Sequence, residues 1–191
     1  MYNNKSNNNS NSSVNKNNNN YNEEHWIKEL ELIPHIEGGR FKEVLRSVEF
    51  DNQGMEKSSF SSIYYLLNEK SISHFHRLKK SDEVWYYHFG GTLTIHCIYP
   101  DGTYEKVLFG PNVGETLQFN VKKNTIISVS FDKENNINSN YNYTLVACMC
   151  CPEFQYDNFE FLKKSELLKL YPQHSKLINE LATEIVPSQF K

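Results

Sequence analysis

The residues best suited to chemistry lie between Ser73 and Gly91, where the chain reads SHFHRLKKSDEVWYYHFGG. His74 and His76 are two residues apart, and Glu83 follows seven residues after His76. Side chains two residues apart in a strand point to the same face, so the two imidazoles are expected to project together. Two histidines and a carboxylate can bind a divalent metal, or they can move protons on a small substrate.

A hairpin in this stretch would bring these groups together. RLKKSD is expected to turn the chain, and DEVWYYHF at 82–89 is expected to return as a second strand. On that strand Glu83, Trp85 and Tyr87 share one face by the same period of two. If the two strands pair, both sets of side chains point into one cavity. The sequence therefore predicts a pocket on this hairpin.

The elements that must position this hairpin are those of an all-β domain. After Phe41 the sequence is a series of short segments rich in β-branched and aromatic residues, and turn signals such as Pro100-Asp101-Gly102 separate them. Many short strands at regular spacing favour a sandwich or barrel over alternating strands and helices. The expected strands span 41–50, 61–68, 72–78, 82–89, 92–99, 103–110, 116–121, 125–131 and 143–151.

Helices are expected on both sides of the strand region. Apolar residues at helical spacing predict a helix over 23–33, which Asn22 can cap and Pro34 ends. A second helical region follows Ser165, and Pro172 suits the first turn of a further helix.

Two segments are rich in asparagine. Residues 1–22 are mostly Asn and Ser, a composition that cannot bury enough apolar surface to fold and is typical of disorder. Residues 134–142 lie between two expected strands and indicate an enlarged surface loop. The sequence therefore predicts a disordered Asn-rich tail over 1–22 and a single domain over 23–191.

Composition narrows the class of partner. The chain has 191 residues and a net charge of -3, so it has no basic footprint for nucleic acid or a membrane surface. No apolar run reaches transmembrane length, and the N-terminus has no apolar signal region, so a cytoplasmic protein is expected. Cys148, Cys150 and Cys151 are expected to be reduced thiols in a buried strand rather than a metal cluster.

Six short motifs in order resemble the uncharacterised RmlC-like branch of the cupin superfamily, whose members are double-stranded β-helix or jelly-roll barrels. The motifs are Glu37-Gly38-Gly39-Arg40-Phe41, Ile63-Tyr64-Tyr65-Leu66-Leu67, Phe75-His76-Arg77, Asp82-Glu83-Val84-Trp85, Pro100-Asp101-Gly102 and Tyr171-Pro172-Gln173-His174. The resemblance covers nearly everything after the Asn-rich tail. It implies a cupin jelly-roll barrel with flanking helices, and it implies a homodimer.

One departure from the family pattern concerns the metal. The second cupin motif carries a histidine that completes the metal site, and here Ile127 stands in its place. A divalent metal would have to use His74, His76 and Glu83 alone. The alternative is a metal-free pocket in which the same groups hydrogen-bond a polar ligand, so no cofactor is certain.

The resemblance implies a sugar or nucleotide-sugar isomerase or epimerase, because epimerases of this fold pair a histidine base with a tyrosine acid. His76 would be the base, and Tyr87 or Tyr65 the acid. The alternatives are a non-catalytic module that binds a small molecule, and a metal-dependent oxygenase. The expected ligand contacts are His74, His76, Glu83, Trp85 and Glu37.

Overall fold

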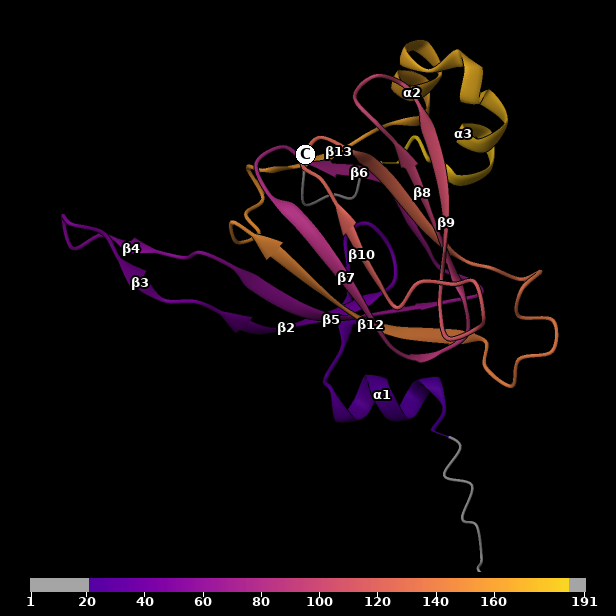
Figure 1. Cartoon of the computed structure of the whole chain (residues 1–191), viewed down its shortest axis with the longest axis horizontal. Helices are drawn as coiled ribbons and strands as arrows, with labels where there is room; N and C mark the ends of the chain where they lie inside the picture. The colour runs from indigo at the N-terminus through magenta and orange to yellow at the C-terminus, as the bar shows by residue number, and fades with distance from the viewer. Residues whose placement is uncertain (1–20, 186–191) are drawn as a thin grey trace, which may run out of the picture.

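The structure, a computed structural model, describes residues 21–185. Two antiparallel sheets form the body of the molecule, with α1 on one side and α2 and α3 on the opposite side (Figure 1). The expected all-β cupin jelly roll with flanking helices is confirmed. Within residues 21–185 no helix is both long enough and apolar enough to span a membrane.

The larger sheet has the strand order β1-β2-β5-β12-β7-β10. Its strands are β1 (Ile33–Pro34), β2 (Arg40–Arg46), β5 (Ser61–Asn68), β12 (Tyr143–Cys151), β7 (Asp82–Gly90) and β10 (Gln118–Val121). The smaller sheet has the order β13-β6-β11-β8-β9. Its strands are β13 (Phe159–Phe161), β6 (Ile72–Leu78), β11 (Ile126–Phe131), β8 (Leu93–Ile98) and β9 (Tyr104–Phe109).

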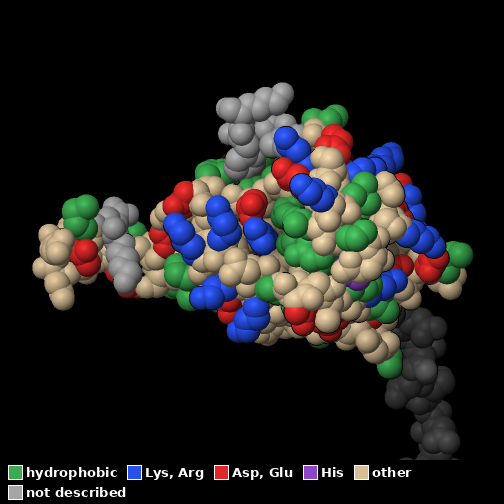
Figure 2. Space-filling view, turned by 90° about the horizontal axis from the view of Figure 1, so that it is seen from above, with side chains coloured by type: hydrophobic (Ala, Val, Ile, Leu, Met, Phe, Trp, Pro, Cys, Tyr) green, Lys and Arg blue, Asp and Glu red, His purple; other side chains and the backbone are tan. Residues whose placement is uncertain are grey.

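A short ribbon of β3 (Glu49–Phe50) and β4 (Glu56–Lys57) joins β2 to β5 and projects away from the barrel (Figure 1). Figure 2 shows hydrophobic side chains at the far end of this projection. Phe50 is 69% exposed and Met55 64% exposed, which is unusual for side chains of this size. The ribbon therefore offers apolar surface that the barrel does not cover.

The main core lies between the two sheets. Alternate residues of each strand point inward, and the larger ones include Tyr65, Trp85, Ile95 and Phe109, all fully buried. Such alternation is what the period of two requires of a sheet with one face in the core. The outer faces carry the helices, which bury smaller apolar clusters of their own.

Helix α1 (Glu23–Glu29) begins where the sequence predicts, because the Asn22 side chain accepts a hydrogen bond from the backbone N–H of His25 at 2.9 Å. It ends several residues before Pro34, however. Glu31 has a positive φ of 53°, which turns the chain so that Leu32 is buried. The burial of Leu32 thus outweighs the helical periodicity of the segment.

The predicted tail over 1–22 lies largely outside the described residues, but Tyr21 and Asn22 are described. The Tyr21 carbonyl accepts a hydrogen bond from the Tyr143 hydroxyl, and Asn22 caps α1. Tyr21 and Asn22, which the prediction assigns to the tail, are therefore in contact with the folded domain.

Deletion of residues 1–20 is expected to leave the melting temperature unchanged, whereas deletion through Asn22 should lower stability by about 0.5–2 kcal/mol because it removes the helix cap. Thermal unfolding of the two shortened chains beside the full chain checks this. A loss of several degrees from the shorter deletion alone would contradict it.

At the other end of the chain, α2 (Lys164–Leu170) and α3 (Ser175–Leu181) cover the outer face of the smaller sheet. Leu167, Ile178 and Leu181 pack there against Phe75 and Ile98. A 3-10 turn (Pro172–His174) joins the two helices, with Pro172 at its start as predicted.

The Asn-rich segment 134–142 is a loop between β11 and β12, as predicted, but one of its side chains is buried. The Asn136 amide accepts from the Thr92 N–H at 2.8 Å, and it donates to the Thr92 carbonyl at 2.8 Å and to the Asp132 carbonyl at 2.6 Å. It satisfies the backbone of Thr92 much as a neighbouring strand would.

Candidate functional site

A cavity of about 400 Å³ opens where the ends of β2, β12 and β6 meet the beginnings of β5 and β7. The loop at 152–158 supplies one wall with Phe154, Gln155 and Tyr156. Polar groups on the opposite walls include His76, Glu37 and Glu83. The barrel thus holds a pocket of small-molecule size with a few acid–base groups inside it.

His76 and Glu37 form a buried pair in this cavity. His76 Nδ1 lies 2.8 Å from the His74 carbonyl oxygen, and His76 Nε2 lies 3.2 Å from Glu37 Oε2. A carbonyl oxygen can only accept, so Nδ1 carries a hydrogen and donates it. Nε2 faces the Glu37 carboxyl, so both ring nitrogens of His76 lie against oxygen atoms of the protein.

The turn before β2 brings Glu37 into the cavity. Glu37 Oε1 accepts a hydrogen bond from Ser73 Oγ at 3.1 Å, and the Glu37 carbonyl accepts from the His74 N–H at 2.8 Å. Gly38 follows with a φ of 118°, and its carbonyl accepts from the Tyr65 hydroxyl at 2.7 Å. The turn is thus attached to β6 on one side and to β5 on the other.

Glu83 is the second carboxyl of the cavity and stands near the start of β7, opposite Cys150 of β12. Burial raises its pKa to about 7, and the negative charge of Glu37 acts in the same direction. His76, Trp85 and Cys148 lower the pKa by less. None of the ion pairs among residues 21–185 includes Glu83. Both protonation states are therefore populated near neutral pH.

His74 does not join the cavity. Ile127 of β11 pairs with His76 and Val129 pairs with Ser73, so three steps along β6 oppose two along β11. This bulge reverses the alternation, which places Ser73 rather than His74 beside Glu37. His74 instead has its Nδ1 2.8 Å from the carbonyl of Leu181 in α3. The expected parity of the two histidines is corrected accordingly.

The metal site expected from His74, His76 and Glu83 is not assembled, because His74 is turned toward α3. Among residues 21–185 no group of three His, Cys, Asp or Glu side chains is arranged to hold a metal ion. The fully buried Ile127 offers no ligand in place of the family's histidine. The residues present do not fit a divalent cation.

The aromatic residues expected around the ligand also lie elsewhere. Trp85 is in the core, with its ring 5.9 Å from Tyr65 and 6.3 Å from Phe109. The Tyr87 hydroxyl donates to the Gly90 carbonyl at 2.6 Å, and the Tyr65 hydroxyl is engaged with Gly38. None of Trp85, Tyr87 and Tyr65 lines the cavity. The structure therefore places no hydroxyl of these two tyrosines where it could meet a ligand.

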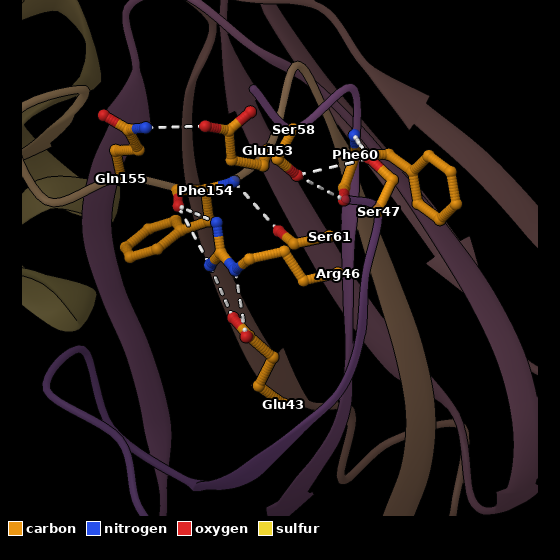
Figure 3. A network of polar contacts seen from close by, with 9 residues as sticks. All are labelled: Glu43, Arg46, Ser47, Ser58, Phe60, Ser61, Glu153, Phe154 and Gln155. Carbon is orange, nitrogen blue, oxygen red and sulfur yellow. Dashed lines mark hydrogen bonds and ion pairs between the residues drawn. The ribbon is translucent and has the colours of Figure 1, made fainter. Parts of the chain in front are cut away.

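Arg46 lies at the cavity wall in a polar network that the sequence did not indicate (Figure 3). Its Nε and Nη2 bond the two carboxylate oxygens of Glu43 at 3.1 and 2.6 Å. Nη1 and Nη2 also donate to the Phe154 carbonyl at 3.3 Å, and the Phe154 N–H donates to Ser61 Oγ at 2.9 Å. The network fastens the 152–158 loop to β2 and β5.

Two thiols, Cys148 and Cys150, also line the cavity from β12. Burial raises the pKa of both, and Glu83 and Glu37 add to the effect. Both are therefore protonated and poorly reactive at neutral pH. The prediction of reduced thiols in a buried strand is confirmed for these two, while Cys151 is free but exposed.

The comparisons with known proteins agree with the fold. The family described as Cupin superfamily (DUF985) matches residues 24–162. A hypothetical protein from Leishmania major is 37% identical with a TM-score of 0.77, over 86% of this chain and 100% of that one. A protein from Shewanella oneidensis is 37% identical with a TM-score of 0.76, over 86% and 99%. No curated protein matches. The chain belongs to the cupin superfamily, in the DUF985 family.

Proposed function

We propose that the cavity binds a small polar molecule and moves a proton on it, as an isomerase or epimerase does. The observation that carries this proposal is the buried Glu37–His76 pair in the same cavity as Glu83, whose pKa of about 7 suits a proton-transfer group. The cavity volume of about 400 Å³ falls within the usual range for small-molecule sites, roughly 300–1,000 Å³.

In this proposal Glu83 takes the role of base. Nδ1 of His76 donates to the His74 carbonyl and Nε2 faces Glu37, so the Glu37 carboxyl stands where a substrate proton would have to approach His76. Glu83 removes the proton from a carbon next to a carbonyl group, and the electron pair moves onto the carbonyl oxygen. The His76–Glu37 pair stabilises that oxygen, and Glu83 then gives the proton back to the same or the neighbouring carbon as the electron pair leaves the oxygen. This differs from the role of base that the family resemblance gives to His76.

Deuterium exchange tests the proposal even when the product is unidentified. The full chain is incubated in D2O with a panel of aldoses and ketoses, and NMR follows deuterium at the carbon next to the carbonyl. We expect incorporation whose rate rises with pH through about 7, as Glu83 loses its proton. Glu83→Gln should slow it by about 10²–10⁴-fold. Glu134→Gln, on the exposed Asn-rich loop, is the control and should leave the rate unchanged.

A non-catalytic binding module is the second candidate. It is favoured by the Tyr65 and Tyr87 hydroxyls, because both donate to backbone carbonyls rather than facing the cavity. Sugars that raise the melting temperature without any incorporation of deuterium would support this second function and contradict the first.

We also propose a homodimer, supported by the apolar surface of β2 and the β3–β4 ribbon. Val44, Leu45, Val48 and Phe50 are all about half exposed or more along this edge of the larger sheet. Exposed apolar surface of this kind marks interaction sites, and two-fold pairs are the commonest soluble assembly.

Light scattering is expected to give about twice the chain mass of 22.4 kDa. A double change of Leu45 and Phe50 to Asp should convert the dimer to monomer, because it puts charge into the apolar surface. A mass near 22.4 kDa for the unchanged chain at micromolar concentration would contradict the dimer.

A further inference from the structure

Each cationic or basic side chain on the cavity wall already has its partner or is neutral. The Arg46 guanidinium is bound to both carboxylate oxygens of Glu43 and to the Phe154 carbonyl. His76 Nε2 lies 3.2 Å from Glu37 Oε2. Burial lowers the pKa of His35, which is therefore neutral at neutral pH. Among residues 21–185 the cavity wall thus holds no cation that could receive an anionic ligand.

The carboxyl groups on the cavity wall, in contrast, do not all have a basic partner. Glu43 is paired with Arg46 and Glu37 with His76, but Glu83 has no ion-pair partner among the described residues. The net charge of the cavity therefore follows Glu83, and it is either zero or negative. The Glu83 carboxylate only accepts hydrogen bonds, so a donor group suits it, and a positively charged donor suits it best.

The rest of the wall is aromatic on one side. Phe154 lies with its ring 5.2 Å from that of Tyr156 and 6.0 Å from that of Phe159, and Phe41 also lines the cavity. Aromatic rings bury apolar surface well, and their faces attract cations. The wall therefore suits a ligand body without negative charge.

From these contacts we propose that the ligand carries an ammonium group on an otherwise uncharged body, with the ammonium at Glu83 and the body against the aromatic wall. The proposal rests on the proposed function and deepens it by naming the substrate class: the ammonium pairs with one oxygen of the Glu83 carboxylate, and the other oxygen takes the carbon-bound proton. A phosphate or carboxylate inside the cavity would face Glu37 and Glu83 without a free cation from residues 21–185. The diphosphate of a nucleotide sugar is therefore not a group that this cavity selects.

Binding of an ammonium group should also release protons. The groups that face Glu83 are Glu37, His76 and the protonated thiols of Cys148 and Cys150. With the pKa of Glu83 at about 7, this carboxyl is about half protonated at pH 7. A positive charge beside it favours the carboxylate and expels the remaining proton. An uncharged ligand leaves the proton in place, and an anion draws one in.

Three probes with one phenyl body and different charge test this on the full chain: benzylamine, benzyl alcohol and benzoate. Titration calorimetry at pH 7, in two buffers of different ionisation heat, gives affinity and proton release together. We expect benzylamine to bind about tenfold more tightly than benzyl alcohol and to release up to about half a proton. Benzoate should bind most weakly. Glu83→Gln should remove both the preference and the release, and Glu134→Gln should keep both.

Three results would overturn the proposal: benzoate binding as tightly as benzylamine, no saturable benzylamine binding up to about 10 mM, or an unchanged preference in Glu83→Gln. None of the probes has an exchangeable carbon-bound proton next to a carbonyl, so the titration does not read the proposed proton transfer. Deuterium incorporation without an amine preference overturns only this inference. An amine preference without incorporation on any substrate overturns only the isomerase chemistry.

Discussion

Replacement of Trp85 by alanine is expected to lower the free energy of unfolding by about 3–5 kcal/mol, because it empties the middle of the barrel core. Trp85 is 1% exposed and packs edge to face against Tyr65 and Phe109. Trp85 and these two neighbours belong to three different strands, so no single side chain can move in to fill the space. The loss is one of packing and not of a ligand contact.

Urea unfolding at fixed pH measures this change, and Trp26→Ala is the matched control. Trp26 lies on α1, outside the barrel core, and is only partly buried, so its loss should cost less. The folded fraction of Trp85→Ala should still bind benzylamine. Near-normal stability combined with lost binding would show that Trp85 contacts the ligand, as its place on the predicted hairpin first indicated.

Gly38→Ala is expected to break the site and to destabilise the barrel together. Gly38 has a φ of 118°, where an L side chain is strained at a cost of about 1–3 kcal/mol. In addition, a Cβ here would lie 2.0 Å from the backbone oxygen of Ile72 at the start of β6. The turn must therefore move away from β6, which separates Glu37 from Ser73 and His76. Deuterium incorporation should fall by at least about 100-fold.

Gly54→Ala is the control that distinguishes the strain of a positive φ from the close approach of Gly38 to the Ile72 backbone oxygen. Gly54 also has a positive φ, of 75°, but a Cβ there would meet no atom within 4 Å. The stability of Gly54→Ala should fall only by the cost of the strained φ, and its rate of deuterium incorporation should equal that of the unchanged chain. Thermal unfolding and the deuterium assay on both variants measure these two quantities. Equal and small effects at the two glycines would mean that the contact with Ile72 does not hold Glu37 in place.

The contrast between these glycines shows how far the sequence could predict the site. Glu37 was expected to contact a ligand, and the sequence places it directly before the paired glycines Gly38 and Gly39. What places Glu37 inside is the contact of Gly38 with Ile72, two residues that are far apart in sequence. Only the folded chain brings them together.

The strands β6 and β7 show the complementary case. The hairpin predicted from them does not form, because β6 pairs with β11 and β13 in the smaller sheet and β7 pairs with β10 and β12 in the larger one. Both strands were predicted within one or two residues, because their composition and turn signals are strong. The faces of their side chains were not, because the bulge between Ser73 and His76 leaves no mark in the pattern of apolar residues. One extra residue is enough to exchange His74 for Ser73 beside Glu37.

The wall of the cavity was beyond prediction for a different reason. Arg46 is held by the backbone carbonyl of Phe154, 108 residues further along the chain. A backbone acceptor has no signature in the sequence, and Phe154 lies in a loop rather than in a periodic element. Cys148 and Cys150, by contrast, alternate on β12 as a strand requires. Their burial was therefore predictable, although the sequence alone did not show that they face the cavity.

The buried amide of Asn136 affects which changes of length the loop at 134–142 can tolerate during evolution. Segments rich in one residue type tend to gain and lose copies of it, and five of the nine residues at 134–142 are asparagine. Asn135 precedes Asn136, so one inserted asparagine still leaves an asparagine four positions after Asp132, where the amide bridges to Thr92. The extra length then falls on the exposed part of the loop. Because Asn135 lies next to Asn136, the buried hydrogen-bonding position keeps an asparagine when one asparagine is inserted into the loop.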